Sequence, residues 1–289
     1  VVTFISYYFI HKYLLVNTIS YKFIGAVSMY EIKEEDAQGN VALIYSDLRK
    51  SLNIKVVNTI WRYLATIDGG LEWVWNSSKK LYKSGKLEKV QSQIIENIQI
   101  HDLTPIPDYI LSSVGIKKEE KLEILQIINK YNIGNSKNLI GLSSFLKAYD
   151  SKIFFKKNIL IENKVFQNDA SSLIKQETWK SINSLSKMFV NSNDYIPFPP
   201  GLYMELARWP SFLSLIWGMF SGLDIKLFQN DISSLNKRTE AIIDPFINDI
   251  NIIKKPDNRI DINIPIHNLT TVVIPKMIIV GTMLKKSLS

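Results

Sequence analysis

The sequence predicts a helical protein built from two related halves, because one segment returns in weaker form 142 positions later. Within the first copy, Val57, Ile60, Trp61 and Leu64 follow the i, i+3, i+4, i+7 spacing that places apolar side chains on one stripe of a helix. The matched positions, first copy before second, are Trp61 and Tyr203, Leu64 and Leu206, Ala65 and Ala207, Leu71 and Leu213, Trp75 and Trp217, and Leu81 and Leu223.

Each copy is predicted to be a helical hairpin with a corner in its middle. In the first copy Asp68-Gly69-Gly70 interrupts the stripe, because paired glycines are costly inside a helix, and a second stripe follows. In the second copy Pro210 marks the corner, since proline is tolerated in the first turn of a new helix. The tryptophans of both copies (Trp61, Trp73, Trp75, Trp209 and Trp217) are expected in the core, with a ligand cage as the alternative.

Composition removes several classes of chemistry. The 289 residues are 46% hydrophobic, which argues for a folded protein, and they include no cysteine, so thiolate nucleophiles and Cys-ligated metals are excluded. The three histidines (His11, His101 and His267) are far apart in sequence, which disfavours a histidine metal site. The net charge of +8 is spread along the chain without a nucleic-acid-reading motif, so it predicts attraction of small anions instead.

The N-terminal residues 1–28 are apolar and aromatic, but His11, Lys12 and Lys22 interrupt them before they reach the roughly 20 residues of a membrane span. They are interpreted as an extension outside the fold, with membrane anchoring as the alternative. The first helical repeat is placed at 29–150, and Asp169 starts the second repeat, 169–289. The stretch 151–168 lacks a helical period and is predicted to link the two.

Three further helices are expected around these hairpins. Leu87 to Ile98 is amphipathic, and Lys117 to Tyr131 is a second helix that ends at Asn132-Ile133-Gly134-Asn135, where glycine suits a C-cap. Asp169 to Met188 resumes helix.

The last third of the chain mixes clear and ambiguous signals. Residues 191–201 are too rich in proline and turn formers for a helix. Residues 230–253 are predicted to be helical with a break at Pro245. The stretch from Thr270 to Leu284 favours a strand by its β-branched residues alone.

Several motifs together resemble the group I 2-haloacid dehalogenases: YSDLRKSL and IWRYLAT in the first hairpin, NKYNIGNSKNLI at 129–140, and ELARWP at 205–210. The resemblance implies an all-α fold of two related helical repeats forming a pseudo-two-fold unit, with a cleft between them, and it favours a helix over residues 270–284. It implies hydrolysis of a small 2-halocarboxylic acid by activated water, with no cofactor.

In that family an aspartate activates the water, and the resemblance places Leu202 at its position. Leucine cannot accept a proton, so the family's principal catalytic group is missing here. Glu205, three residues further along the same predicted helix, and Asp194, in the preceding loop, are substitutes to consider, against the alternative of a solvated glutamate and a turn-forming aspartate.

Asn135 matches the family's water-positioning asparagine, and it is the catalytic residue that the resemblance predicts. Its amide can both donate and accept hydrogen bonds. Capping of the predicted helix end at Gly134 is the alternative role. The family tyrosine three positions later corresponds to Asn138.

Further residues are placed at the substrate pocket by the resemblance. Val56 and Thr59 replace aromatic pocket residues of the family, and Asn58 and Arg62 are polar positions beside that wall, although a surface salt bridge is the alternative for Arg62. The predicted substrate-binding set is Val56, Thr59, Asn138, Gly201, Leu202 and His267.

Two functions follow as hypotheses. One is a divergent 2-haloacid dehalogenase whose ordinary activity is in doubt, and the other is a non-catalytic binder of a small carboxylic acid on the same scaffold. No metal or cofactor is expected. The expected partner is a small carboxylic acid rather than nucleic acid or a membrane, the expected location is the cytoplasm, and a homodimer is left open.

Overall fold

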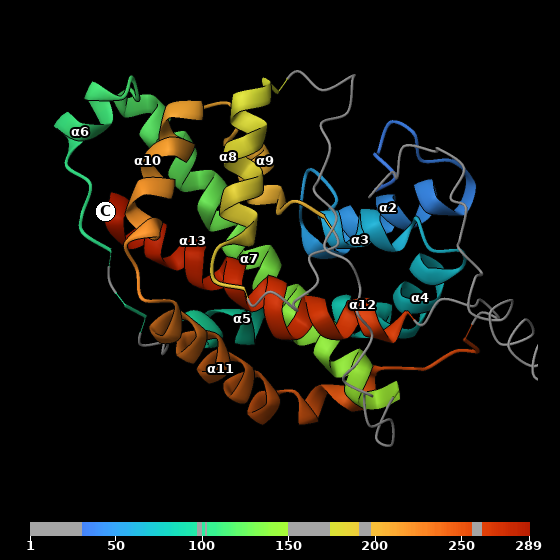
Figure 1. Cartoon of the computed structure of the whole chain (residues 1–289). Coiled ribbons are helices and arrows are strands. Elements are labelled where there is room, and N and C mark those ends of the chain that lie inside the picture. The colour runs from blue at the N-terminus through green and yellow to red at the C-terminus, as the bar shows by residue number, and fades with distance from the viewer. Residues whose placement is uncertain (1–30, 97–99, 102, 150–173, 191–197, 256–261) are drawn as a thin grey trace, which may run out of the picture.

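The chain folds as an assembly of packed helices in the computed structural model (Figure 1). The structure describes residues 31–96, 100–101, 103–149, 174–190, 198–255 and 262–289. No β-strand occurs within these ranges, so the all-α class predicted from the sequence is confirmed for the described residues. The N-terminal extension 1–28 and the predicted linker 151–168 lie outside them, and the two domain boundaries stay predictions.

The helical elements follow one another with short connections. In chain order they are α2 (Gly39–Leu52), α3 (Thr59–Leu64), α4 (Gly70–Tyr82), α5 (Lys86–Glu96), α6 (Asp108–Ser113), α7 (Lys118–Tyr149), α8 (Gln176–Lys187), α9 (Gly201–Leu206), α10 (Pro210–Ser221), α11 (Ile225–Ile242), the 3-10 helix η1 (Asp244–Asp249), α12 (Asn263–Asn268), the π-helical turn η2 (Leu269–Val273) and α13 (Ile274–Leu288).

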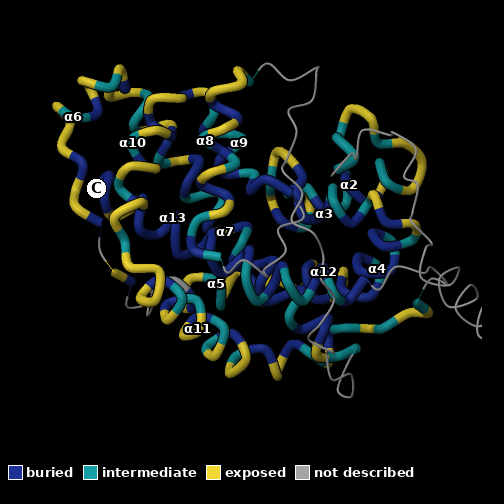
Figure 2. Tube along the Cα trace, viewed as in Figure 1, coloured by how far each residue is buried: buried dark blue, intermediate teal, exposed yellow. Residues whose placement is uncertain are grey.

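Helices α7 and α13 pack against each other through the middle of the molecule, with α2, α3 and α4 towards one side and α8, α9 and α10 towards the other (Figure 1). In Figure 2 the trace of α13 is mostly dark blue, which marks buried residues, whereas α7 is buried chiefly between Asn132 and Leu146. Gly281 on α13 makes the close approach possible, because a β-carbon there would stand 2.0 Å from Asn132 Oδ1 of α7.

Helix α7 does not end where the sequence predicts. The expected C-cap at residues 132–135 is wrong, because the helix continues unbroken to Tyr149. Its glycines serve packing instead: a β-carbon on Gly134 would stand 3.2 Å from Asn58 Nδ2, and one on Gly141 would stand 2.3 Å from the Tyr82 hydroxyl. Tertiary contact thus overrides the local cost of glycine within a helix.

The C-terminal stretch is helical, as the resemblance implies and against its β-branched composition. Helix α13 is apolar on nearly every side because it is buried on nearly every side. By length and hydropathy the continuous helix Asn263–Leu288 could cross a membrane, and α10 with α11, bent by 98°, passes the same test as a pair. However, 72% of the apolar window in Asn263–Leu288 is buried inside the protein, as in the core helix of a soluble protein.

The first hairpin is confirmed as α3 and α4 with a corner at Gly69, whose φ of 66° is left-handed. Its aromatic side chains form a packed cluster: the Trp61 ring lies 5.7 Å from the Trp75 ring and 5.5 Å from the Tyr82 ring, both edge to face. Trp75 also donates from Nε1 to Asp47 Oδ2 at 3.1 Å. These tryptophans are therefore core residues.

Of the two tryptophans of the second copy that were predicted to be buried, Trp209 is buried, whereas the prediction for Trp217 is wrong. Trp217 is 45% exposed, whereas its sequence counterpart Trp75 is 1% exposed. The equivalent core positions of α10 are occupied by Phe212, Leu213 and Ile216, which cover the inner stripe of that helix and leave Trp217 on its outer side.

Other predicted elements are present with shifted ends. Helix α5 confirms the amphipathic helix near residues 87–98, and α8 confirms helix up to Lys187. The helix predicted from residue 230 begins earlier, at Ile225, and it gives way to η1 at Asp244, next to Pro245. The six-residue helix α6, after the prolines of residues 103–107, was not predicted.

Candidate functional site

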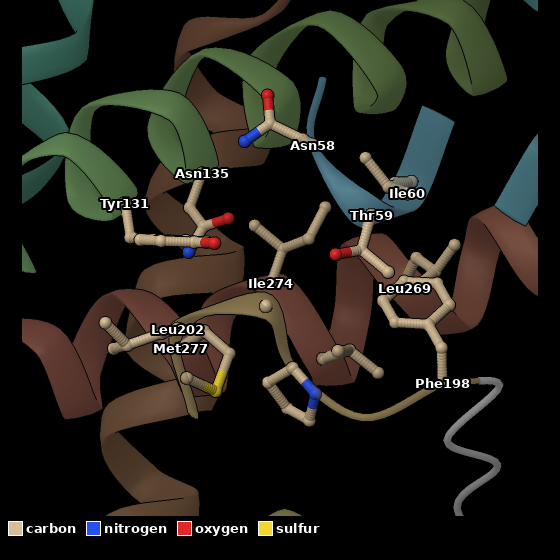
Figure 3. A pocket seen from close by; sticks show the side chains of 13 residues that line it. Asn58, Thr59, Ile60, Tyr131, Asn135, Phe198, Leu202, Leu269, Ile274 and Met277 are labelled. Carbon is tan, nitrogen blue, oxygen red and sulfur yellow. The ribbon is translucent and has the colours of Figure 1, made fainter. Parts of the chain in front are cut away.

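A small pocket opens where α3, α7, α9 and the start of α13 meet (Figure 3). Its cavity volume is about 40 Å³, room for roughly three water molecules at ~10–15 Å³ each. The residues that line it are Asn58, Thr59, Ile60, Tyr131, Asn135, Phe198, Pro200, Gly201, Leu202, Leu269, Val273, Ile274 and Met277. Four residues of the predicted site are therefore brought together: Thr59, Asn135, Gly201 and Leu202.

The first wall is the N-terminal end of α3, which contributes Asn58, Thr59 and Ile60. The preceding loop is held by Glu34, whose Oε1 accepts a hydrogen bond from the Val57 backbone N–H at 2.7 Å. The other oxygen of Glu34 pairs with Arg49 on α2. The segment just before α2 thus fixes the backbone that presents this wall.

The second wall is one face of α7. Tyr131 and Asn135 are four residues apart, so they project side by side from the helix, and both point into the pocket in Figure 3. The role of Asn135 as a helix cap is wrong, because the residue lies inside α7. The sequence analysis did not predict Tyr131 as a pocket residue, because it ended the helix at residues 132–135 and so did not place Tyr131 and Asn135 on the same helical face.

The third wall comes from the start of α9. Gly201 faces both other walls closely: a β-carbon there would stand 2.8 Å from Thr59 Oγ1 and 3.0 Å from the Tyr131 hydroxyl. Leu202 is 1% exposed and lines the pocket with its apolar side chain. Asn58, Thr59 and Ile60 thus face Pro200, Gly201 and Leu202, residues that stand 142 positions later in the chain.

The remaining lining is apolar and comes from Phe198 and from the η2–α13 segment, which contributes Val273 and Met277. Sequence reasoning missed these residues. The available signal was the i, i+4 spacing of Val273 and Met277, but a helix that is apolar on all sides does not reveal which of its faces borders a cavity.

The polar groups of the pocket are neutral hydroxyls and amides. Thr59 Oγ1 accepts a hydrogen bond from Arg62 Nη2 at 3.2 Å, and Asn58 Oδ1 is buried without a hydrogen-bond partner. Burial raises the pKa of the Tyr131 hydroxyl far above its ordinary value, and the neighbouring Glu205 charge raises it further. Tyr131 is therefore a neutral phenol at physiological pH.

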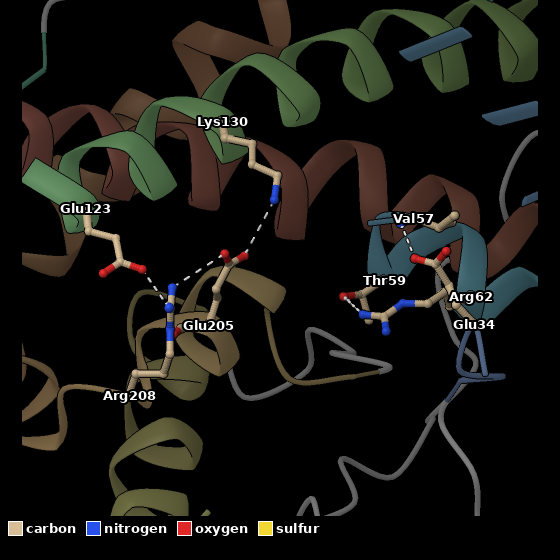
Figure 4. Close-up of polar contacts among 8 residues, drawn as sticks. All are labelled: Glu34, Val57, Thr59, Arg62, Glu123, Lys130, Glu205 and Arg208. Atoms are coloured by element: carbon tan, nitrogen blue, oxygen red, sulfur yellow. Dashed lines mark hydrogen bonds and ion pairs between the residues drawn. The ribbon is translucent and has the colours of Figure 1, made fainter. Parts of the chain in front are cut away.

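Glu205 does not line the pocket. Its carboxylate lies 3.9 Å from Lys130 Nζ and 3.8 Å from Arg208 Nη2, and Arg208 pairs with Glu123 at 2.6 Å (Figure 4). Glu205 thus reaches the pocket only by way of its neighbour Tyr131. The second substitute carboxylate, Asp194, lies outside the described residues.

Three predicted binding residues lie away from the pocket. Asn138 is 1% exposed, and its Oδ1 accepts hydrogen bonds from Trp61 Nε1 at 3.1 Å and from the Tyr82 hydroxyl at 3.5 Å. It therefore pairs with the polar groups of the aromatic core. Val56 is 50% exposed on the loop before α3. His267 belongs to α12, and burial lowers the pKa of its imidazole.

The described part of the chain holds no group of three or more histidine, aspartate or glutamate side chains placed as metal ligands. None of the described lining residues of the pocket carries a carboxylate or a positive charge. The site can therefore hold a ligand through neutral hydrogen-bonding groups and apolar contact.

The fold is that of the D-2-haloacid dehalogenases, judged from solved structures that it resembles. A D-2-haloacid dehalogenase mutant in complex with D-2-CPA matches with a TM-score of 0.57 and 17% identity, covering 89% of this chain and 92% of that one. A D-2-haloacid dehalogenase in complex with L-LA matches with a TM-score of 0.58 and 17% identity, over 89% and 90% of the two chains. No protein-family model and no curated protein matches the sequence.

Proposed function

We propose that the pocket binds a small carboxylic acid, and that this chain is a divergent relative of the 2-haloacid dehalogenases with little ordinary dehalogenase activity. The observation that carries the proposal is the pairing of Asn135 with Leu202 in one pocket. Asn135 offers an amide for a polar ligand, whereas Leu202 stands where the resemblance implies the water-activating aspartate.

Hydrolysis of a carbon–halogen bond by water needs a group that accepts the proton of that water. Thr59, Tyr131, Asn58 and Asn135 are neutral and can position a carboxylate or a water, but they have no useful basicity. The cavity of about 40 Å³ also favours a ligand of only a few heavy atoms. Binding is therefore better supported than turnover.

The proposal is tested by titrating the purified protein with propionate and by measuring halide release from 2-chloropropionate. Saturable binding with little halide release is expected. Leu202→Asp should raise halide release above the native level. Leu202→Asn should not, because asparagine has the shape of aspartate but cannot act as a base. Native halide release at a rate typical of enzymes would contradict the proposal.

Hydrolysis is the second candidate, favoured by the position of Glu205 beside the Tyr131 hydroxyl. In this reading Tyr131 passes a proton from the attacking water to the Glu205 carboxylate. Glu205→Gln would then abolish halide release while leaving propionate binding in place. If native release is negligible, or if it survives in Glu205→Gln, this candidate fails.

We also infer that the pocket lies between two related helical repeats. Helix α9 begins and ends 142 positions after α3, and three consecutive residues of each copy line the pocket. Superposing residues 59–82 on residues 201–224 tests the relation, since two related hairpins must turn with the same hand.

We also propose that the protein is located in the cytoplasm, since its C-terminal apolar helix is mostly buried. Cell fractionation tests this location.

A further inference from the structure

Arg62 lies directly behind the neutral wall of the pocket. Its Nη2 donates a hydrogen bond to Thr59 Oγ1 at 3.2 Å and lies 3.2 Å from Glu31 Oε2 (Figure 4 shows the contact with Thr59). The backbone of the same residue accepts a hydrogen bond from the Ile32 N–H at 3.1 Å. The charged side chain is thus fixed between the segment before α2 and the pocket wall.

The contact with Arg62 decides what Thr59 can offer to a ligand. A hydroxyl has one proton to donate and two lone pairs to accept with. Because the guanidinium occupies one lone pair of Thr59 Oγ1 and cannot itself accept, the Thr59 proton is available for the pocket. A donor next to a cation forms stronger hydrogen bonds to anionic acceptors than a donor in neutral surroundings.

The pair of Arg62 and Glu31 does not satisfy all of its own polar atoms. Arg62 Nε is buried without a hydrogen-bond partner, Glu31 Oε2 has no hydrogen-bond partner beyond the ion pair with Arg62 Nη2, and burial raises the pKa of the Glu31 carboxyl. The side chains are only 18% and 11% exposed, so little water screens their charges. Both charges therefore act on whatever occupies the pocket beyond Thr59.

We propose that Arg62, acting through Thr59, is the positioning residue that makes the pocket select carboxylates over neutral molecules of the same shape, and that Glu31 moderates this selectivity. The inference rests on the proposed function of the pocket. It assigns opposite effects to the two partners of one ion pair, because one charge attracts the bound carboxylate and the other repels it.

The test measures the affinities for propionate and for propionamide, its neutral isostere, by titration calorimetry. Arg62→Met is expected to weaken propionate binding by about tenfold, because solvent and the opposing charge of Glu31 reduce the attraction well below that of two isolated charges in contact. Propionamide binding should change by less than about twofold. Arg62→Lys should keep most of the preference because it keeps the charge.

Glu31→Gln supplies the decisive comparison, since it should strengthen propionate binding while Arg62→Met weakens it. A purely structural role of the pair would make both variants weaken both ligands together, and that result would overturn the inference. If Arg62→Met does not fold, Glu31→Gln and Arg62→Lys still decide the question. Lys121→Met is the control, because Lys121 pairs with Asp108 outside the pocket and should not alter the ratio of affinities.

The outcomes separate this inference from the proposed function. Native protein that binds neither propionate nor propionamide overturns both. Native protein that binds propionate with a preference unaffected by Arg62→Met and Glu31→Gln overturns only the role given to the ion pair. Opposite changes in the two variants, with the amide unaffected, support both.

Discussion

Thr59 and Gly201, which stand 142 positions apart, meet across the pocket, and Thr59 Oγ1 lies 2.8 Å from the point where a β-carbon on Gly201 would be. The two residues begin α3 and α9, which have the same length. The absence of a side chain on one of them leaves room for the hydroxyl of the other. The pocket therefore depends on a difference in side-chain size between the first residues of two helices that lie 142 positions apart.

Gly201→Ala should fill this gap. The new methyl group would push against Thr59 and Tyr131, so we expect a loss of about 1–3 kcal/mol of unfolding free energy, typical of overpacking, and loss of propionate binding. Denaturant unfolding and titration measure the two effects. Gly218→Ala on α10 is the control: its β-carbon would meet no atom within 4 Å, and it should be neutral or stabilising by up to about 1 kcal/mol.

Trp75→Ala and Trp217→Ala should differ, although the two residues match in the sequence repeat. Emptying the buried Trp75 site is expected to cost about 3–5 kcal/mol, because the ring packs against Trp61 and Tyr82. Replacing the half-exposed Trp217 with alanine should cost less than about 1 kcal/mol of unfolding free energy. Urea unfolding of both variants checks this, and equal losses would show that Trp217 packs in the core.

Asn135→Ala and Asn138→Ala should separate binding from stability. Asn138 accepts from buried Trp61 Nε1, so its removal leaves that donor unpaired and should cost about 1–3 kcal/mol. Asn135 lines the pocket, and its loss should weaken propionate binding with a smaller effect on unfolding. The measurements are denaturant unfolding and titration on each variant. A reversed pattern would place the ligand beside the aromatic core instead.

Lys276 should make stability depend on pH above neutrality. Its buried Nζ donates to the carbonyls of Leu185 and Ser186 at the C-terminal end of α8, at 3.1 and 2.7 Å. Burial lowers its pKa to about 7, against about 10.4 in the unfolded chain. Between these values the unfolded chain binds one more proton than the folded one, so stability rises with pH, by at most about 1.4 kcal/mol per unit.

Unfolding free energies at several pH values from 7 to 10 measure this slope. Lys276→Met should flatten the rise, because no group with a lowered pKa remains at that position. Lys147→Met, which removes a half-exposed lysine paired with Asp244, is the control, and its stability should still rise with pH. An unchanged slope in Lys276→Met would assign the pH dependence to other groups.

The sequence by itself determined the helical class and the hairpin of α3 and α4 with its corner at Gly69, while its resemblance to the 2-haloacid dehalogenases pointed to four residues that line the pocket. These features depend on local signals: apolar residues at helical spacing, left-handed glycine, and motifs that fall in single elements. The similarity between two segments that lie 142 positions apart was also visible in the order of residues.

Only the tertiary structure decided the rest. Gly134 lies inside α7, where the side chain of Asn58, the residue just before α3, occupies the space beside it. Asn138 lies near Asn135 in sequence, but packing turned its amide towards Trp61 and away from the pocket. Trp217 lies outside because other side chains fill the inner face of α10. Each outcome depends on which surfaces meet, and helical periodicity fixes the faces of a helix without choosing their partners.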